Sequence, residues 1–164
     1  MQSSKETLLK IKNNFTFFKN LSNEEILAIC TDITFLKVKK GENIFKQDSE
    51  SNEIYCIIKG KIGIYICRED LQSDNERTHV VSLEEKHLFG EIAAVTGEPR
   101  NASAIAEVNS ILLRFRLMQY SSYHKDAIIK VYRNLISILS DKIKNNNMEL
   151  HAFMDEEIVD LEDE

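Results

Sequence analysis

Residues 33–115 alternate between short runs of β-branched and aromatic residues and short turn sequences, and this pattern limits the possible fold more than any other feature of the chain. The runs are ITFLKV, NIFKQ, EIYCIIKG, KIGIYIC, THVVSL, ASAIAEV and SILLRF. In KIGIYIC, Ile62, Ile64 and Ile66 alternate with other residues, which is typical of a strand with one buried face. Many short strands at close spacing predict a small β-barrel or jelly roll.

Helical signals flank this region on both sides. Before it, residues 3–12 can form a short amphipathic helix, and Ser22 followed by Glu25 is a capping box that begins a second one. After it, residues 125–147 carry apolar side chains at a spacing of 3.6, which predicts a helix of about 20 residues. The expected apolar faces are Leu8, Leu9 and Ile11, then Ile26, Leu27 and Ile29, and last Ile128, Val131, Tyr132, Leu135, Ile138, Leu139 and Ile143.

The predicted fold class is therefore α+β and mainly β: a jelly-roll β-barrel with N-terminal helices and a long C-terminal helix. With 164 residues the chain can bury a substantial core as one domain. We expect N-terminal helices over residues 1–32, the β-core over 33–115, hinge and lid or dimerisation helices over 116–147, and an acidic tail over 148–164. The last ten residues contain seven acids and no base, which predicts a solvated, disordered tail.

This tail accounts for the negative charge of the chain. The formal net charge is −6, whereas residues 1–154 alone carry +1, so there is no basic face of the kind that binds nucleic acid. No apolar stretch has the length of a signal peptide or a membrane span. Three cysteines without a Cys-x-x-Cys pair indicate reduced core thiols. We expect a cytoplasmic protein with neither nucleic acid nor membrane as a partner.

The segment FGEIAAVTGEPRNAS, residues 89–103, holds half of the six Gly and Pro residues of the chain, with Glu91 and Arg100 nine residues apart. Gly90 permits an unusual turn or the close approach of a ligand. A guanidinium can bind phosphate oxygens through paired, charge-assisted hydrogen bonds. A carboxylate accepts a hydrogen bond from a hydroxyl. An acid for a sugar hydroxyl and an arginine for a phosphate together describe a ribose-phosphate site.

The same segment resembles the phosphate-binding cassette of cyclic nucleotide-binding domains, whose pattern is Phe-Gly-Glu, a small apolar helical turn, then Pro-Arg and small residues. The matching residues are Phe89, Gly90, Glu91, Ala93, Pro99, Arg100 and Ala102. GENIFKQD (41–48) and IYCIIKGKIGIYI (54–66) resemble the strands and hairpin of that family, and the helix from about residue 125 resembles its hinge and lid helix. The resemblance covers roughly residues 15–145.

This resemblance implies a stand-alone, non-catalytic regulatory protein that binds a cyclic nucleotide, cAMP rather than cGMP, and needs no cofactor. Glu91 would hold the ribose 2′-hydroxyl and Arg100 the cyclic phosphate. Backbone N–H groups near Ala93 and Asn101 would complete the anion site. The base would lie against a residue of the final helix, and movement of that helix would be the output. The implied ligand-binding residues are Gly90, Glu91, Ile92, Ala93, Arg100, Asn101, Ala102, Tyr132 and Arg133.

Two positions depart from the family pattern. Asn101 stands where a small residue or a threonine is usual, and Ala94 replaces a larger apolar residue, so the base preference stays open. The C-terminal helix offers two further alternatives, because its apolar stripe can pack on the barrel or form a homodimer seam. In the homodimer the expected contacts are Ile128, Leu135, Ile138 and Leu139. An unknown protein partner is the other recipient of the signal.

The same residues also allow other functions. Glu91 and Arg100 could form a structural ion pair, or the domain could have lost its ligand and act as a protein–protein interaction module. A metal-dependent jelly-roll enzyme needs clustered ligands, and the four histidines are scattered along the chain. A transcription regulator needs a helix-turn-helix after the long helix, and the residues after Asn147 are too few and too acidic for one.

Overall fold

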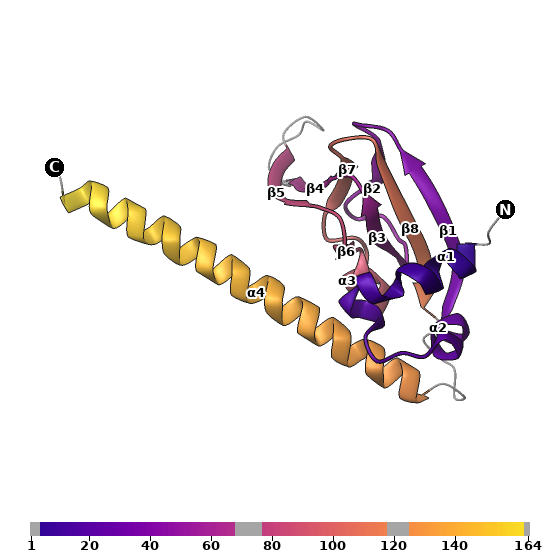
Figure 1. Cartoon of the computed structure of the whole chain (residues 1–164). Helices are drawn as coiled ribbons and strands as arrows, with labels where there is room; N and C mark the ends of the chain where they lie inside the picture. Colours follow the sequence, from indigo (N-terminus) through magenta and orange to yellow (C-terminus); the bar gives the residue numbers. More distant parts are fainter. Residues whose placement is uncertain (1–3, 68–76, 118–124, 163–164) are drawn as a thin grey trace.

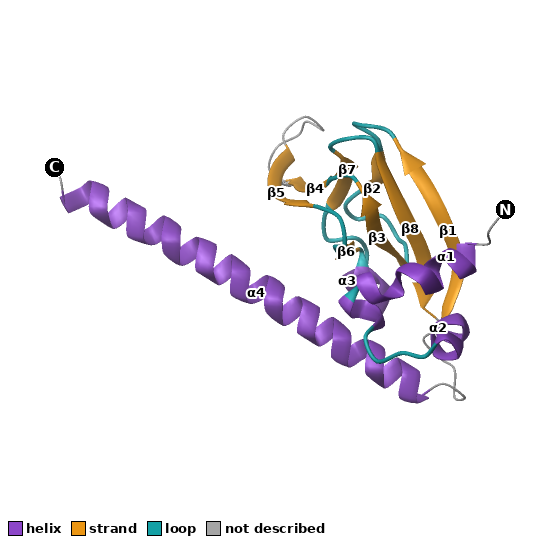
Figure 2. Ribbon diagram, viewed as in Figure 1, coloured by secondary structure: helices purple, strands orange, loops and turns teal. Residues whose placement is uncertain are grey.

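The structure, a computed structural model, describes residues 4–67, 77–117 and 125–162, and it places two antiparallel four-stranded sheets beside a long C-terminal helix (Figures 1 and 2). The helices are α1 (Ser4–Ile11), α2 (Asn23–Ile29), α3 (Glu91–Thr96) and α4 (Lys125–Glu162), with 3-10 turns η1 (Lys12–Asn14) and η2 (Thr16–Phe18). The strands are β1 (Cys30–Val38), β2 (Asn43–Phe45), β3 (Glu53–Lys59), β4 (Ile62–Cys67), β5 (Arg77–Leu83), β6 (Leu88–Phe89), β7 (Ser103–Ala106) and β8 (Ser110–Leu117). One sheet has the order β1-β8-β3-β6 and the other β2-β7-β4-β5. The predicted fold class is confirmed.

Each predicted strand segment overlaps one strand of the structure, and the differences lie at strand ends. Strand β6 was not predicted, because two residues are too short to show a period and pair only with Tyr55 and Cys56 of β3. Residues 116–117, predicted to start a helical turn, continue β8 instead. Strand pairing extends the strand, because Arg116 pairs with Thr31 of β1 on one side and with Glu53 of β3 on the other. The rest of that predicted turn, 118–123, lies outside the described residues.

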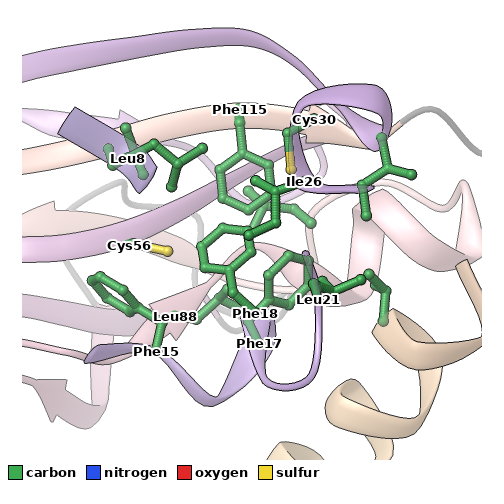
Figure 3. Close-up of a cluster of buried hydrophobic side chains, with 14 of the residues drawn as sticks. Leu8, Phe15, Phe17, Phe18, Leu21, Ile26, Cys30, Cys56, Leu88 and Phe115 are labelled. Carbon is green, nitrogen blue, oxygen red and sulfur yellow. The ribbon is translucent and has the colours of Figure 1, made fainter. Parts of the chain in front are cut away.

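The larger core cluster joins the N-terminal helices to the β1-β8-β3-β6 sheet (Figure 3). Phe115 of β8 is fully buried, and its ring centroid lies 5.4 Å from that of Phe17 and 5.6 Å from that of Phe18. Cys30 and Cys56 belong to the same cluster, and burial raises the pKa of the Cys30 thiol to about 12. These two cysteines are core thiols as predicted, whereas the third lies half-buried at the end of β4.

The start of α2 confirms the predicted capping box. Glu25 N donates to Ser22 Oγ at 3.2 Å, and Ser22 N donates to Glu25 Oε2 at 2.7 Å. The predicted buried face is wrong at Leu27, which is 37% exposed, while Ile26 and Ile29 are fully buried. A helix of seven residues buries a narrow stripe at i and i+3, and the next residue points about 100° away from it. In α1 the same holds, since only Leu8 among the three predicted positions is fully buried.

Helix α4 is longer than predicted, with 38 residues that correspond to about 57 Å. The tail predicted to be disordered from residue 148 is part of this helix as far as Glu162, which corrects the prediction. The sequence contains no Gly or Pro after Pro99, so nothing in it breaks the helix, and Glu is a good helix former. Figure 1 shows α4 starting near α2, passing α3 and continuing beyond the strands. None of the described helices, α4 included, combines the length and apolar character needed to cross a membrane.

The first half of α4 is packed against the body of the protein. Val131 and Leu135 are buried, and Asn134 beside them is 8% exposed. Asn134 Nδ2 donates to the carbonyl of Phe17 at 2.9 Å and to that of Lys19 at 2.8 Å. Of the homodimer contacts predicted from the sequence, Leu135 is buried in the core of this protein, whereas Ile128 and Ile138 are half-buried and pack against that core. Homodimerisation through this helix stays a prediction.

Replacing Asn134 with leucine is expected to lower the free energy of unfolding by about 1–3 kcal/mol, because two backbone carbonyls lose a donor in a buried position. Urea denaturation of both proteins measures this difference. Asn145→Leu is the matched control, since this exposed residue on the same helix should change the stability by less than about 0.5 kcal/mol. Equal effects of both substitutions would mean that the two hydrogen bonds do not anchor α4.

Candidate functional site

Residues 89–103 form a strand end, the short helix α3 and a turn that returns to the sheet; we call this segment the cassette. Gly90 precedes α3 with a φ of 78°, and a Cβ at this position would lie 2.7 Å from Arg100 Nη1. Gly97 ends α3 with a φ of 75°, the left-handed conformation that commonly follows a helix. The two glycines therefore shape the turns at both ends of α3, and Gly90 also leaves room for the arginine.

The side chain of Arg100 is only 1% exposed and is folded into the body of the protein. Its Nη1 donates to the carbonyl of Gly90 at 2.7 Å. Its Nη2 donates to Ser51 Oγ at 2.9 Å and to the carbonyl of Glu53 at 2.8 Å. The guanidinium carbon lies 4.2 Å from the ring centroid of Phe45, within the range of a cation–π contact.

Neutral groups supply all of these contacts to Arg100. Among the described residues no ion pair joins it to a carboxylate, so it does not form the structural pair with Glu91 considered above. Its Nε is buried without a hydrogen-bond partner. Burial lowers the pKa of Arg100, because a charge is disfavoured away from water. An anion brought to this guanidinium would supply both a counter-charge and an acceptor.

Glu91 at the start of α3 is also buried, with 3% exposure, but it has a cationic partner. Lys142 Nζ of α4 lies 2.7 Å from Glu91 Oε1 and donates to the carbonyl of Leu88 at 3.3 Å. Helix α4 therefore touches the cassette at the carboxylate that the resemblance assigned to a sugar hydroxyl. Lys142 contacts Oε1, and the second oxygen of the carboxylate can accept a hydrogen bond from a further donor.

A cavity of about 960 Å³ opens beside the cassette. Strand β2, the loop before β3 and the turn after α3 form its walls, which include Phe45, Ser51, Glu53, Tyr55, Ala93 and Pro99. Neither Glu91 nor Arg100 is part of the lining. Arg100 nevertheless lies directly behind the wall, because it contacts Phe45 and donates to Ser51. The volume is within the range of sites for small organic ligands.

The cassette contains seven of the nine predicted ligand-binding residues: Gly90, Glu91, Ile92, Ala93, Arg100, Asn101 and Ala102. Ile92 and Asn101 are exposed, while Ala93 and Ala102 are buried. The other two, Tyr132 and Arg133, are exposed on α4, ten and nine residues before Lys142. That separation corresponds to about 14–15 Å along the helix, so the structure does not bring them to Glu91. Their role as lid residues stays a prediction.

Lys142, Phe45 and Tyr55 were not identified from the sequence. The sequence does contain a signal for Lys142, since it lies seven residues after Leu135 on the buried face of α4. A lysine on such a face needs a counter-charge. Phe45 and Tyr55 have none, because the 5.8 Å contact of their rings arises only when β2 and β3 come together. That contact places two aromatic faces beside Arg100.

Comparison with known sequences places this site in a family context. Residues 35–125 match the profile of the cyclic nucleotide-binding domain. The cAMP-dependent protein kinase regulatory subunit of Dictyostelium discoideum is 29% identical over 127 residues, which are 77% of this chain and 38% of that protein. The cGMP-dependent protein kinase 2 of Homo sapiens is 22% identical over 110 residues, 67% of this chain and 14% of that protein. The chain thus spans less than two fifths of the length of either relative.

Solved structures show the same fold. The catabolite activator protein of Thermus thermophilus superimposes with a TM-score of 0.63 at 21% identity, covering 84% of this chain and 62% of that one. The regulatory subunit of a cAMP-independent protein kinase A from Trypanosoma brucei gives a TM-score of 0.63 at 19% identity, covering 80% of this chain and 47% of that one. At these identities the similarity establishes the fold alone.

Proposed function

The chain belongs to the cyclic nucleotide-binding domain family, and we propose that it is a cytoplasmic, non-catalytic regulatory protein that binds a cyclic nucleotide and signals through α4. The observation that supports this best is Arg100, a buried cation behind a cavity wall, with one unpaired N–H and no ion-paired carboxylate among the described residues. We propose cAMP as the preferred ligand. Its support is the Dictyostelium relative, which is named cAMP-dependent and is more similar than the human cGMP-dependent kinase.

Arg100 is the proposed partner of the cyclic phosphate. Two of its three hydrogen bonds go to backbone carbonyls, and the third goes to the hydroxyl of Ser51 in the cavity wall. An incoming phosphate oxygen can replace this hydroxyl without leaving a carbonyl unpaired. The phosphate would also neutralise the buried charge, which neutral groups cannot do.

Glu91 is the proposed partner of the ribose 2′-hydroxyl, and Lys142 connects it to α4. A hydroxyl that donates to the Glu91 carboxylate weakens the hold of that carboxylate on Lys142, because the two donors share one negative charge. Ligand binding and the position of α4 are then coupled, and the coupling is reciprocal. Helix α4 then interacts with the cassette differently in the ligand-free and the ligand-bound protein. A ligand can change the position of the helix only through such a difference.

A thermal-shift titration of the full chain with cAMP and cGMP tests the proposal. At about 100 times its dissociation constant a ligand adds roughly 2.7 kcal/mol, which corresponds to about 5–10 °C for a domain of this size. The matched ligand control is 2′-deoxy-cAMP, which lacks the donor for Glu91 and should give a smaller shift at the same concentration. An unchanged melting temperature with both cyclic nucleotides would contradict the proposal.

A domain that has lost its ligand and acts as an interaction module is the second candidate. One observation favours it: the protein's own groups already bind Glu91 and Arg100, and neither side chain lines the cavity. The described residues contain no cluster of three His, Cys, Asp or Glu side chains that could hold a metal, so the geometry offers no support for a metal-dependent enzyme. The titration above separates the two candidates.

Lys142→Gln is expected to tighten cyclic nucleotide binding by roughly twofold to fivefold, because the competitor of the ribose hydroxyl at Glu91 is lost. The effect is small because the lysine is 36% exposed and its ion pair is partly screened. Fluorescence titration with a labelled nucleotide measures the dissociation constants. Lys144→Gln, an exposed lysine on the same helix, should leave the affinity unchanged. Weaker binding by Lys142→Gln would mean that Lys142 assists the ligand instead.

A further inference from the structure

Ser51 is a hydroxyl residue on the loop between β2 and β3, and it contacts the buried guanidinium of the candidate site. It is half-buried, and its neighbours on both sides, Glu50 and Asn52, are exposed. Its Oγ accepts a hydrogen bond from Arg100 Nη2 at 2.9 Å, and the residue is part of the cavity wall. Ser51 therefore combines access from solvent with direct contact to a cation.

The loop that carries Ser51 is held against the cassette by the backbone of Arg100. Asp48 N donates to the carbonyl of Arg100 at 2.8 Å, and Arg100 N donates to the carbonyl of Ser49 at 3.0 Å. A group attached to the Ser51 hydroxyl would therefore stay within reach of the Arg100 side chain.

Positive charge exceeds negative charge around this hydroxyl. Arg114 and Arg116 pair with Glu53 Oε1 at 3.2 Å and 3.3 Å. Arg116 also pairs with the largely exposed Asp32 at 3.3 Å. With Arg100 added, the cluster holds three guanidiniums and two carboxylates among the described residues, a net charge of +1. Glu53 Oε2 lies 3.4 Å from the hydroxyl, but the two arginines offset its charge.

A phosphoryl group on Ser51 would match this cluster. Phosphoserine carries a charge of about −1.5 to −2 at pH 7 and offers three strong acceptor oxygens. Arg100 has neither an ion-paired carboxylate among the described residues nor an acceptor for its buried Nε, and a phosphate supplies both. Lys46 and Arg116 also line the cavity into which the phosphate would extend.

We propose that Ser51 is a phosphorylation site and that its phosphate binds Arg100, the guanidinium to which the proposed function assigns the cyclic phosphate. The two phosphates then compete for one cation, so modification of Ser51 excludes the nucleotide. This exclusion rests on the proposed function, whereas the contact of the phosphorylated side chain with Arg100 does not.

The modification is a phosphoryl transfer from a nucleoside triphosphate, catalysed by a protein kinase. The bond from Ser51 Oγ to the γ-phosphorus forms as the bond from that phosphorus to the β–γ bridging oxygen breaks. The hydroxyl proton passes to a base of the kinase, and a nucleoside diphosphate leaves. Residues 47–54, QDSESNEI, contain three acids and no Lys, Arg or His. The enzyme that fits this segment is therefore a kinase with a basic peptide-binding cleft.

Phosphoserine incorporated at position 51 of the full-length chain tests the contact with Arg100. Without nucleotide it should raise the melting temperature by about 2–6 °C, because it adds charge-assisted hydrogen bonds to a buried cation. In phosphorus NMR titrations the pKa of its phosphate should lie below that of phosphoserine at position 137, because a guanidinium stabilises the dianion. Ser137, exposed on α4, is the matched control. A melting temperature that stays the same or falls, or equal phosphate pKa values, would overturn the proposal.

The same two modified proteins test the exclusion of the nucleotide. Phosphoserine at position 51 should raise the dissociation constant for cAMP at least about tenfold, and phosphoserine at position 137 should leave it unchanged. Unchanged affinity at position 51 would overturn the exclusion. If the unmodified chain binds no cyclic nucleotide either, the proposed function fails, and the melting temperature and the phosphate pKa still decide whether Arg100 holds the phosphate.

Labelling tests whether a kinase modifies Ser51. The full-length chain is incubated with ATP labelled at the γ-phosphate and an extract of cells that make this protein. We expect label on the wild-type chain, and Ser51→Ala should lose most of it. Ser49→Ala is the matched control on the same loop, because the Ser49 hydroxyl donates to the carbonyl of Lys46 instead of contacting Arg100. No label on the wild-type chain, or equal label on Ser51→Ala, would overturn the proposal.

Discussion

Arg100→Ala is expected to abolish the rise in melting temperature caused by cAMP and to lower the free energy of unfolding of the ligand-free protein by about 2–4 kcal/mol. The ligand effect follows from the loss of the only cation proposed for the phosphate. The effect on the free protein follows from burial, since the side chain is 1% exposed and donates three hydrogen bonds.

Arg114→Ala is the matched control for this experiment. Arg114 lies on the neighbouring strand β8, is about one third exposed and forms an ion pair with Glu53 at 3.2 Å. Its loss should destabilise the protein less and leave the response to cAMP unchanged. Thermal-shift measurements with and without cAMP give both quantities for both variants. A full response to cAMP in Arg100→Ala would place the phosphate elsewhere.

Phe115→Ala is expected to lower the free energy of unfolding by about 3–5 kcal/mol, among the largest effects of any single substitution in this chain. The ring is fully buried and packs on both Phe17 and Phe18 (Figure 3), so its removal leaves a cavity between β8 and η2. Because η2 also accepts a hydrogen bond from Asn134, the attachment of α4 should weaken at the same time. Urea denaturation measures the loss of stability.

Two further variants show whether that loss of stability comes from the packing of the Phe115 ring. Phe115→Leu keeps most of the apolar volume and should cost less than about 1.5 kcal/mol. Val108→Ala, at a position 43% exposed, should change the stability by less than about 0.5 kcal/mol. A similar small effect for Phe115→Ala would show that the aromatic cluster is loosely packed and cannot hold α4 in position.

Local sequence patterns predicted the elements that short-range chemistry specifies. The alternation of Ile62 and Ile64 with smaller or polar residues located β4, and the pair Ser22 and Glu25 located the start of α2. The end of α4 could not be predicted in this way, because its acidic composition predicts disorder although the segment contains no Gly or Pro that would break a helix. Composition describes solubility better than it describes where a helix ends.

The candidate site, too, could be predicted only where local sequence patterns specify it. Gly90, Glu91 and Arg100 lie together because eleven consecutive residues carry them, so a linear pattern was sufficient. The inward direction of Arg100 depends on β2 and β3, and the partner of Glu91 comes from a helix 51 residues further along the chain. Pairings over such separations depend on the packing of whole elements, which no local pattern contains.

Isothermal titration calorimetry of the full-length chain with cAMP asks whether the buried guanidinium and carboxylate serve a ligand or only the fold. We expect saturable binding of one nucleotide per chain. A titration without binding heat up to about millimolar cAMP at two temperatures, on protein with intact circular dichroism, would show that Arg100 and Glu91 hold the structure together without receiving a nucleotide.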